Sequence, residues 1–436
     1  MFAELKSLSF KSTIALRLMA SLAAVVLFSA CAPIARPDNF PTVIQTPTKE
    51  ATVPAAASRV TPSVTPSPSL SPTSLPPVVG PGYFPGFNPL TGMPVTDPTT
   101  LDQAPFLVSV TNFPLSARPQ SGLSLASIVW EVSIGQGMSR FLAVYYGDYL
   151  AELEKILEEN PTDNPYGYVI SPIRSGRVVY EDIKVLFPDA TLITRGASPE
   201  VLSQLTNRVG VLPVNSADVN SAGLTMDDLR TLPALPVDPA EHASLVFARD
   251  VPGGGVPADR LGIIYNRFDQ VGWEYSVEQG VYLRSQDLMD DTGILVPAVD
   301  RLTGEQLAFE NVLILFANHH FENQAGTILE IDLLNRASEW GLMFRDGLQY
   351  PVYWSTRGGN LSLKTKEGEI LALKPGQTFI EVVSLQSTWD DEDKLVRFHS
   401  PGIPTLTPSL TFTPTVTLTA TPSIEPTGTP EPQGTP

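Results

Sequence analysis

Four arginines in short motifs are the residues of this sequence best suited to chemistry. Arg118 and Arg140 lie in the first third of the chain, and Arg174 and Arg177 share the segment Pro172–Arg177. The planar guanidinium fork of arginine donates paired hydrogen bonds to carboxylate or phosphate. A turn that carries two arginines can also turn backbone N–H groups toward an anion. These residues predict an anion-binding site.

Polar neighbours complete the predicted ligand-binding set. Glu131 ends the apolar run Ile128–Trp130, so partial burial would suit its carboxyl group to general acid or base work. The simpler alternative is a structural ion pair between Glu131 and one arginine that holds loops together. The full set comprises Arg118, Gln120, Ser121, Glu131, Arg140, Arg174, Ser175 and Arg177.

Nucleophilic catalysis has little support in the sequence. The segment Gly196–Glu200 lacks the second glycine of the G-x-S-x-G motif, and Ser198 is better explained as the N-cap of a helix. The enzymatic alternative that remains is a cell-envelope hydrolase acting on glycan or peptide. In that alternative Glu131 is the acid/base, supported by Asp300 or Ser175.

Metal-binding patterns are equally weak. His319 and His320 are adjacent, so on a strand their side chains point to opposite faces and seldom share one ion. The acidic group at Asp287–Asp291 lacks EF-hand spacing and predicts a solvated turn. Asp390–Asp393 predicts a charged, solvated exit from the folded body. We therefore expect neither a metal nor a cofactor.

The elements that must position these residues alternate between strand and helix in the first half of the body. Strand-like apolar runs occupy Pro105–Thr111 and Phe141–Tyr146, and a short helix running into a strand is expected at Ser124–Trp130. Helices are predicted at Leu150–Asn160, Val201–Val209 and Thr225–Leu232.

The proline-rich joint Leu232–Pro239 separates this half from a second half of short apolar runs and glycines. That pattern predicts a mainly antiparallel β structure, and therefore an α+β fold with a mixed α/β N-terminal half. We expect core positions rather than sugar stacking for Trp130, Trp273, Trp340 and Trp354. The predicted strands are Leu261–Tyr265, Gly280–Arg284, Val312–Phe316, Thr327–Ile331, Gln349–Trp354 and Gln377–Val383.

The body is strongly acidic. Residues 87–400 carry a formal charge of −19 within a chain of −18, because the two ends together contribute +1. Such a surface repels phosphate backbones, so we expect no nucleic-acid partner. Excess carboxylate also keeps an exposed protein soluble, and it therefore does not by itself indicate a cationic partner.

The N-terminus has the features of an export signal. Basic residues precede the 13-residue apolar run Leu18–Ala30, which is the length of a signal-peptide core. The segment Leu27–Cys31 resembles the bacterial lipobox, although Phe28 replaces the usual Leu, Val or Ile. An incidental cysteine behind an ordinary signal, or an uncleaved anchor helix, is the alternative. We expect Cys31, the only cysteine, to be acylated and to fix the protein to the lipid bilayer at the extracytoplasmic face of the cell membrane.

Two proline-rich segments bracket the body. Of the 36 residues 401–436, 9 are proline and 11 are threonine, and residues 32–86 are similarly biased. Such segments cannot bury enough apolar surface to order themselves, and proline makes them semi-stiff spacers. The predicted organisation is a signal peptide at 1–31, a disordered spacer at 32–86, domains at 87–236 and 240–385, and a disordered tail at 400–436.

Motifs spread over residues 87–385 carry a family resemblance. They are Asn88–Pro94, Ala117–Leu123, Ile128–Glu131, Ser139–Ala143, Pro172–Arg177, Gly196–Pro199, Tyr282–Gln286, Thr303–Leu307, Asn311–Val312 and Lys374–Thr378. Together they resemble the YerB-type bacterial lipoproteins, a family of two adjacent domains of unknown function. Glu241–Ala243 stands where that family tends to have Pro-His-Asn, and Ser171 where glycine is usual. The resemblance implies a fold and a location, and no established reaction.

These observations predict a membrane-anchored extracytoplasmic lipoprotein that binds an anionic ligand or an envelope partner, such as a cell-wall polymer or an envelope protein. The hydrolase is the alternative, and an assembly role through an exposed edge strand is a third. Glycoside chemistry requires a second carboxylate about 5–10 Å from Glu131 across a cleft. A single binding site requires Arg118, Glu131, Arg140 and Arg174 to converge on one open cleft.

Overall fold

The computed structural model describes residues 78–82, 85–135, 137–161, 163–212, 218–233, 235–322, 328–392 and 394–400. All of them fall within the unit Thr73–Pro436. Cys31, the predicted signal peptide, most of the predicted spacer and the tail after residue 400 lie outside the described residues. Among those described, no helix is both long and apolar enough to cross a membrane.

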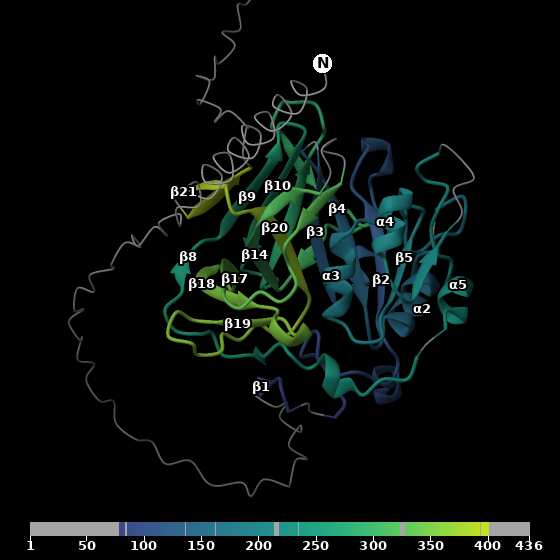
Figure 1. The fold of residues 1–436 in the computed structure, drawn as a ribbon, viewed down its shortest axis with the longest axis horizontal. Coiled ribbons are helices and arrows are strands. Elements are labelled where there is room, and N and C mark those ends of the chain that lie inside the picture. The colour runs from purple at the N-terminus through teal and green to yellow at the C-terminus, as the bar shows by residue number, and fades with distance from the viewer. Residues whose placement is uncertain are drawn as a thin grey trace, which may run out of the picture. The chain divides into compact units, whose positions relative to one another are not determined.

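An 11-stranded sheet runs through both halves of the chain (Figure 1). β20 lies between β14 and β3 and is parallel to both, so a strand from the second half is hydrogen-bonded to the first half. The strands in spatial order are β19 (Ser362–Lys364), β18 (Leu348–Ser355), β17 (Glu339–Arg345), β14 (Asn311–Ala317), β20 (Thr378–Ser384), β3 (Ile128–Gly135), β4 (Met138–Tyr145), β2 (Phe106–Thr111), β5 (Thr191–Thr194) and β6 (Val209–Val211), with β8 (Val256–Pro257) paired to β18.

A second, 7-stranded sheet is formed by the second half alone. All its pairs are antiparallel except β9 with β22. Its order is β12 (Leu295–Pro297), β11 (Val281–Asp287), β10 (Asp269–Ser276), β9 (Arg260–Asn266), β22 (Leu395–His399) and β21 (Thr388–Glu392), with β13 (Ala308–Phe309) paired to β11. Two small sheets pair β1 (Val78–Val79) with β7 (Phe247–Ala248), and β15 (His319–Phe321) with β16 (Leu329–Ile331).

Apolar residues cover both faces of the 11-stranded sheet. In β14, Val312 and Ile314 join a core cluster that includes side chains of the 7-stranded sheet. Leu313 and Leu315 join a second cluster that includes the helix α3 (Val179–Val185). Successive side chains of a strand point to opposite faces, and burying each such side chain contributes about 1.5–3 kcal/mol. This is why the run around β14 is apolar without alternation.

Local capping explains where the short helices begin. Ser198 Oγ accepts a hydrogen bond from Val201 N at the start of α4 (Pro199–Gln204). Thr225 forms a capping box with Asp228 at the start of α5 (Met226–Thr231). The described residues also form the helix α2 (Tyr149–Glu159) and the 3-10 turns η1 (Pro98–Asp102), η2 (Leu115–Ala117), η3 (Leu123–Leu125), η4 (Pro239–His242) and η5 (Arg357–Gly359).

The predicted fold class is confirmed: helices gather in the first half, and most strand pairs of the second half are antiparallel. The helix predicted to reach Val209 ends at Gln204, because Asn207 and Arg208 adopt left-handed backbone conformations and Val209 begins β6. α3 and the strands β10 and β17 are additional elements that the pattern did not predict.

The folded body extends beyond both predicted limits. Val78 and Val79 pair with β7 although they precede residue 87, and β21 and β22 follow residue 385. The stretch Asp390–Asp393 is predicted as a solvated exit from the body. Asp391 is exposed and Asp390 is half-buried, but both belong to the strand β21. Trp389 of this strand stacks on Trp340 at 4.9 Å between ring centroids.

Candidate functional site

The eight predicted ligand-binding residues separate into two groups on opposite faces of the 11-stranded sheet. In the β3–β4 pair, Glu131 is opposite Phe141 and Val132 is opposite Arg140. Residues opposite each other share a face and adjacent residues do not. Glu131 and Arg140 therefore point to different faces, and the four residues expected to meet in one cleft do not do so.

Glu131 is fully buried and fully hydrogen-bonded. Its Oε2 accepts a hydrogen bond from Nη2 of Arg284 at 2.8 Å, in an ion pair with both side chains inaccessible to solvent. Its Oε1 accepts hydrogen bonds from Ser139 Oγ at 2.5 Å and from Asn112 Nδ2 at 3.3 Å. The predicted alternative of a structural ion pair is therefore realised, with an arginine from the second half as the partner.

A second buried carboxyl group, Glu381, is next to Glu131 in the sheet. The two are register partners in the parallel β20–β3 pair. Glu381 accepts hydrogen bonds from Tyr265 OH at 2.8 Å and from Trp273 Nε1 at 3.0 Å. Burial and the nearby Glu131 charge raise the pKa of Glu381 well above its usual range. Arg284 neutralises Glu131 through the buried ion pair.

Arg284 is enclosed by aromatic rings. Its guanidinium carbon lies 5.1 Å from the centroid of Phe141, 5.4 Å from that of Phe379 and 5.9 Å from that of Trp273. Nη1 also donates a hydrogen bond to Gln286 Oε1 at 3.1 Å. Ring faces and the carboxylates together hold this cation in the interior, and its pKa is raised although burial opposes the charge.

Asp269 is the third buried carboxyl group. Its Oδ2 accepts a hydrogen bond from Ser139 N at 2.6 Å, and its Oδ1 lies 3.5 Å from Asn112 Nδ2. Burial, followed by the charge of Glu131, raises the pKa of Asp269 to about 7, while Arg118 acts in the opposite direction. Asp269 thus changes its charge near neutral pH.

Arg118 connects this group of buried side chains to Asp287. Nε donates to Asn112 Oδ1 at 3.1 Å, and Nη1 donates to the carbonyl oxygen of Asp287 at 2.7 Å and pairs with its carboxylate at 3.3 Å. A pocket of about 340 Å³ reaches Arg118 and Gln286, with walls that are mainly apolar. We call the connected set the carboxylate–arginine network: Asn112, Arg118, Glu131, Ser139, Asp269, Arg284, Asp287 and Glu381.

Gln120, Ser121 and Asp300 have backbone-anchoring roles beside this network. Gln120 Nε2 donates to Thr111 O at 3.1 Å, and Ser121 Oγ donates to Val169 O at 2.9 Å. Asp300 accepts from the backbone N–H groups of residues 122, 124 and 302 at 2.8–2.9 Å. All three side chains are buried. The geometry does not favour the hydrolase alternative, because Glu131, Glu381 and Asp300 have protein partners and no exposed face.

The second group, Arg140, Arg174, Ser175 and Arg177, meets at the carboxyl ends of the parallel strands β2 and β5. Pro172 O accepts a hydrogen bond from Thr111 N at the end of β2. Arg174 N donates to Ser109 O, and Arg174 O accepts from Arg195 N just beyond β5, both at 2.9 Å. Arg140 Nη1 donates to Ser175 O at 2.9 Å. The loop 172–177 is thereby fastened across both strand ends.

Arg195 belongs to the same place, although the motifs did not single it out. It follows directly after the buried strand β5, which is the signal that could have identified it. Its side chain is buried and donates to Asp218 O at 3.0 Å and to Ser221 Oγ at 2.9 Å. We call Arg140, Arg174, Arg177 and Arg195 the arginine site.

Burial lowers the pKa of Arg140, Arg174 and Arg177, and neighbouring arginines lower it further for Arg140 and Arg174. Burial lowers the pKa of Arg140 to about 9, with further lowering by Arg177 and Arg174. Burial also lowers the pKa of Arg174, to which Arg195 and Arg177 add, and the pKa of Arg177. Across the described part of the chain, no carboxylate forms an ion pair with Arg140, Arg174 or Arg177.

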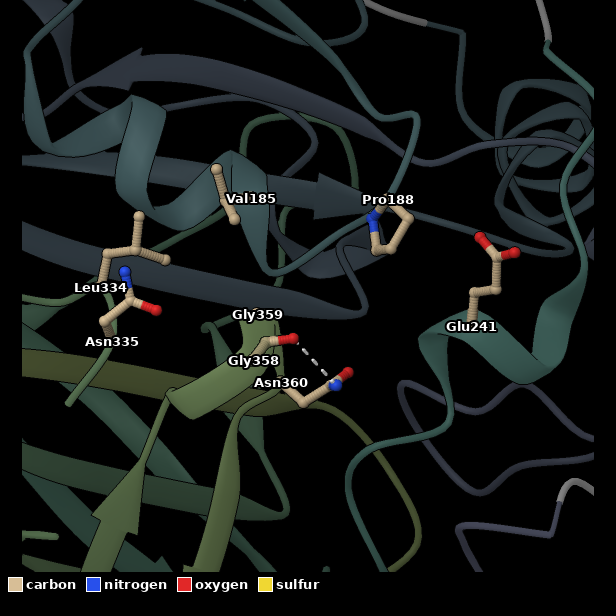
Figure 2. A pocket seen from close by; sticks show the side chains of 8 residues that line it. All are labelled: Val185, Pro188, Glu241, Leu334, Asn335, Gly358, Gly359 and Asn360. Carbon is tan, nitrogen blue, oxygen red and sulfur yellow. Dashed lines mark hydrogen bonds between the residues drawn. The ribbon is translucent and has the colours of Figure 1, made fainter. Parts of the chain in front are cut away.

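Other concave and metal-like features are separate from both groups. A pocket of about 520 Å³ lies between the end of α3 and η5. Figure 2 shows its lining side chains, among which Glu241 supplies a carboxylate and Asn335 and Asn360 supply amides. Within the described ranges, no group of three or more His, Cys, Asp or Glu side chains could hold a metal ion. His319 and His320 lie in β15, and His319 Nδ1 is 3.0 Å from Ala317 O.

Comparison with known proteins identifies the class. The family model for "Protein of unknown function (DUF3048) N-terminal domain" matches residues 90–233, and that for the DUF3048 C-terminal domain matches residues 261–380. The chain therefore belongs to the YerB-type family, an α+β class built from these two domains, as its motifs predicted.

A particular relative, the YerB protein of Bacillus subtilis, was compared in sequence and in structure and shows how far the likeness extends. The Bacillus subtilis (strain 168) protein named "Putative lipoprotein YerB" is 25% identical over 316 residues, which cover 68% of this chain and 85% of the relative. The crystal structure of the YerB protein from Bacillus subtilis matches with a TM-score of 0.52 and 24% identity, over 68% of this chain and 96% of that one. The second comparison supports the fold.

Proposed function

We propose that this protein is an extracytoplasmic lipoprotein, anchored to the membrane through acylated Cys31, whose body binds an anionic ligand or envelope partner at the arginine site. The anchor is supported by the lipobox-like segment Leu27–Cys31 and by the name of the Bacillus relative. Two acyl chains give stable membrane attachment, because each buried methylene contributes about 0.8 kcal/mol.

The absence of carboxylate partners at Arg140, Arg174 and Arg177 in the described structure carries the binding proposal. Charged side chains that are largely removed from water are normally paired, because desolvation of an unpaired charge is costly. Here three arginines approach one another in a body of formal charge −19. An arriving anion would relieve their repulsion and complete their hydrogen bonds, so ligand binding accounts for an arrangement that folding alone disfavours.

The binding test uses the purified full-length chain and two variants, Arg174→Ala and Arg177→Ala. Both variants should lose retention on isolated cell-wall fragments or on envelope proteins. Arg267→Ala is the matched control, because Arg267 is an exposed arginine paired with Asp291 elsewhere on the body. Undiminished retention of both arginine-site variants would remove this site from the proposal.

The anchor is tested separately. Cells expressing the wild-type chain and Cys31→Ser are labelled with a radioactive fatty acid and separated into membrane and soluble fractions. The wild-type protein should carry label and sediment with membranes, and Cys31→Ser should lose the label. Membrane-bound, unlabelled wild-type protein would contradict acylation and support the uncleaved anchor helix.

A further inference from the structure

The N–H groups of Arg174 that donate no hydrogen bond to a described residue indicate the charge and shape of the ligand. Resting on the proposed anion binding, we propose that the arginine site takes a dianionic phosphoryl group, as in a phosphate monoester, and that Arg174 makes the principal contact.

Donor supply singles out Arg174. Arg140 uses Nη1 to hold the carbonyl oxygen of Ser175, and Arg177 uses Nη1 on the carbonyl oxygen of Gly176. The side chain of Arg174 donates to no described residue and is half-buried, so its five N–H groups are available. Arg140 is better described as a positioning residue, since it fixes the backbone of the loop that carries Arg174 and Arg177.

The arginines of the site come from three separate elements, which suits an anion that accepts hydrogen bonds from several sides. Arg140 comes from β4, Arg174 and Arg177 from the loop 172–177, and Arg195 from the end of β5. A carboxylate presents two oxygens in one plane, which one guanidinium fork satisfies. A phosphoryl group presents three strong acceptor oxygens and can receive donors from several sides. The carboxyl ends of parallel strands are also where open α/β sheets commonly bind ligands.

The charge of the surroundings selects a compact dianion over a polymer. Repulsion among the arginines is relieved more by two negative charges than by one. The acidic body, with formal charge −19, repels an extended polyanion such as a chain of phosphodiesters. A single terminal phosphoryl group delivers two charges to the arginines without bringing further negative charge against the acidic surface.

The experiment compares four small probes by titration calorimetry on the full-length protein at constant ionic strength. Methyl phosphate is a monoester that carries two charges above its second pKa near ~6, while dimethyl phosphate is its singly charged diester. Acetate tests a monocarboxylate, and pyrophosphate tests a larger polyanion. Methyl phosphate and pyrophosphate should bind at least about tenfold more tightly than dimethyl phosphate and acetate, because each charge-assisted fork strengthens with ligand charge.

Variants assign the contact. Arg174→Ala should weaken methyl phosphate binding about tenfold or more, and Arg174→Lys should weaken it less, since lysine keeps the charge but loses the fork. Arg267→Ala should bind as wild type does. Methyl phosphate should also bind more tightly as the pH rises through ~6, where the arginines stay charged and the ligand loses its second proton. Arg174→Lys, as the conservative change, keeps the test valid if the alanine variant unfolds.

The outcomes separate two failures. If dimethyl phosphate or acetate binds as tightly as methyl phosphate, and Arg174→Ala weakens all probes, the anion site stands and the dianionic phosphoryl inference is overturned. If no probe binds the wild-type protein, or if no probe distinguishes wild type from Arg174→Ala, the proposed anion binding at the arginine site fails as well.

Discussion

Replacing Arg284 by methionine should be among the most damaging single changes in the body. Its guanidinium is the direct partner of Glu131 at 2.8 Å, and both side chains are inaccessible to solvent. Removing one partner of a buried pair leaves an uncompensated charge and costs about 3–5 kcal/mol. Methionine keeps most of the apolar stem but also loses the contacts with the rings of Phe141 and Phe379.

The opposite change, Glu131→Gln, should cost less, about 1–3 kcal/mol. Arg284 would still face Glu381, whose pKa is raised partly by the charge of Glu131. When that charge is removed, the pKa of Glu381 should fall, and its carboxyl group can take over as the partner of Arg284. The asymmetry follows from the arrangement of two carboxyl groups around one arginine.

The assay is urea unfolding of the full-length chain at neutral pH, followed by circular dichroism, which gives the free energy of unfolding. The matched control is Arg267→Met, because the Arg267–Asp291 pair is solvent-exposed and should contribute less than about 1 kcal/mol. The reasoning is refuted if Arg284→Met lies within about 1 kcal/mol of wild type. It is also refuted if Glu131→Gln is as costly as Arg284→Met.

Three further predictions concern pH, backbone and capping. Because the pKa of Asp269 is raised to about 7, its favourable contribution to the free energy of unfolding is fully present below the unfolded pKa of 3.8 and is lost as pH rises through about 7. Asp269→Asn should therefore flatten the fall in the free energy of unfolding between pH 4 and pH 7. An unchanged slope would contradict this. Gly122 has φ +88, and a Cβ added to it would lie 2.7 Å from a carbonyl oxygen, whereas Gly304 has φ +72 and open space around it. Thermal unfolding should show a larger loss of stability for Gly122→Ala than for Gly304→Ala. The second variant carries only the backbone cost of about 1–2 kcal/mol. Ser198→Ala should lower the free energy of unfolding by about 1 kcal/mol through the lost N-cap of α4, and no loss in urea unfolding would show that α4 does not depend on this cap.

Elements with strong apolar patterns could be predicted from the sequence. β2 and β14 are buried at every position, and their continuous apolar runs predict this burial. α3 escaped prediction because only 7 residues form it and several are β-branched or aromatic, which individually favour strands. β21 escaped because its acidic residues suggest solvent, while one tryptophan supplies its packing.

The sequence predicted most residues of the site, but only part of their arrangement in space. The arginine motifs identified Arg140, Arg174 and Arg177, which do gather. Glu131 was placed with them because proximity in sequence does not reveal the face of a strand. Its true partner, Arg284, lies more than 150 residues away, and only long-range strand packing brings it there. A lone acid inside an apolar strand, as at Glu381, was a usable signal that pointed to a buried partner.

The position of β20 has a consequence for the order in which the molecule can be made. During synthesis, β3 leaves the ribosome long before β20, which is its hydrogen-bonding neighbour over Ile128–Glu131. One edge of β3 therefore lacks its neighbour through most of translation, and an unpaired strand edge is a template for pairing with other chains. Folding of the sheet is thus completed only after most of the second half has emerged. A chain truncated at the proline-rich joint would present that edge permanently.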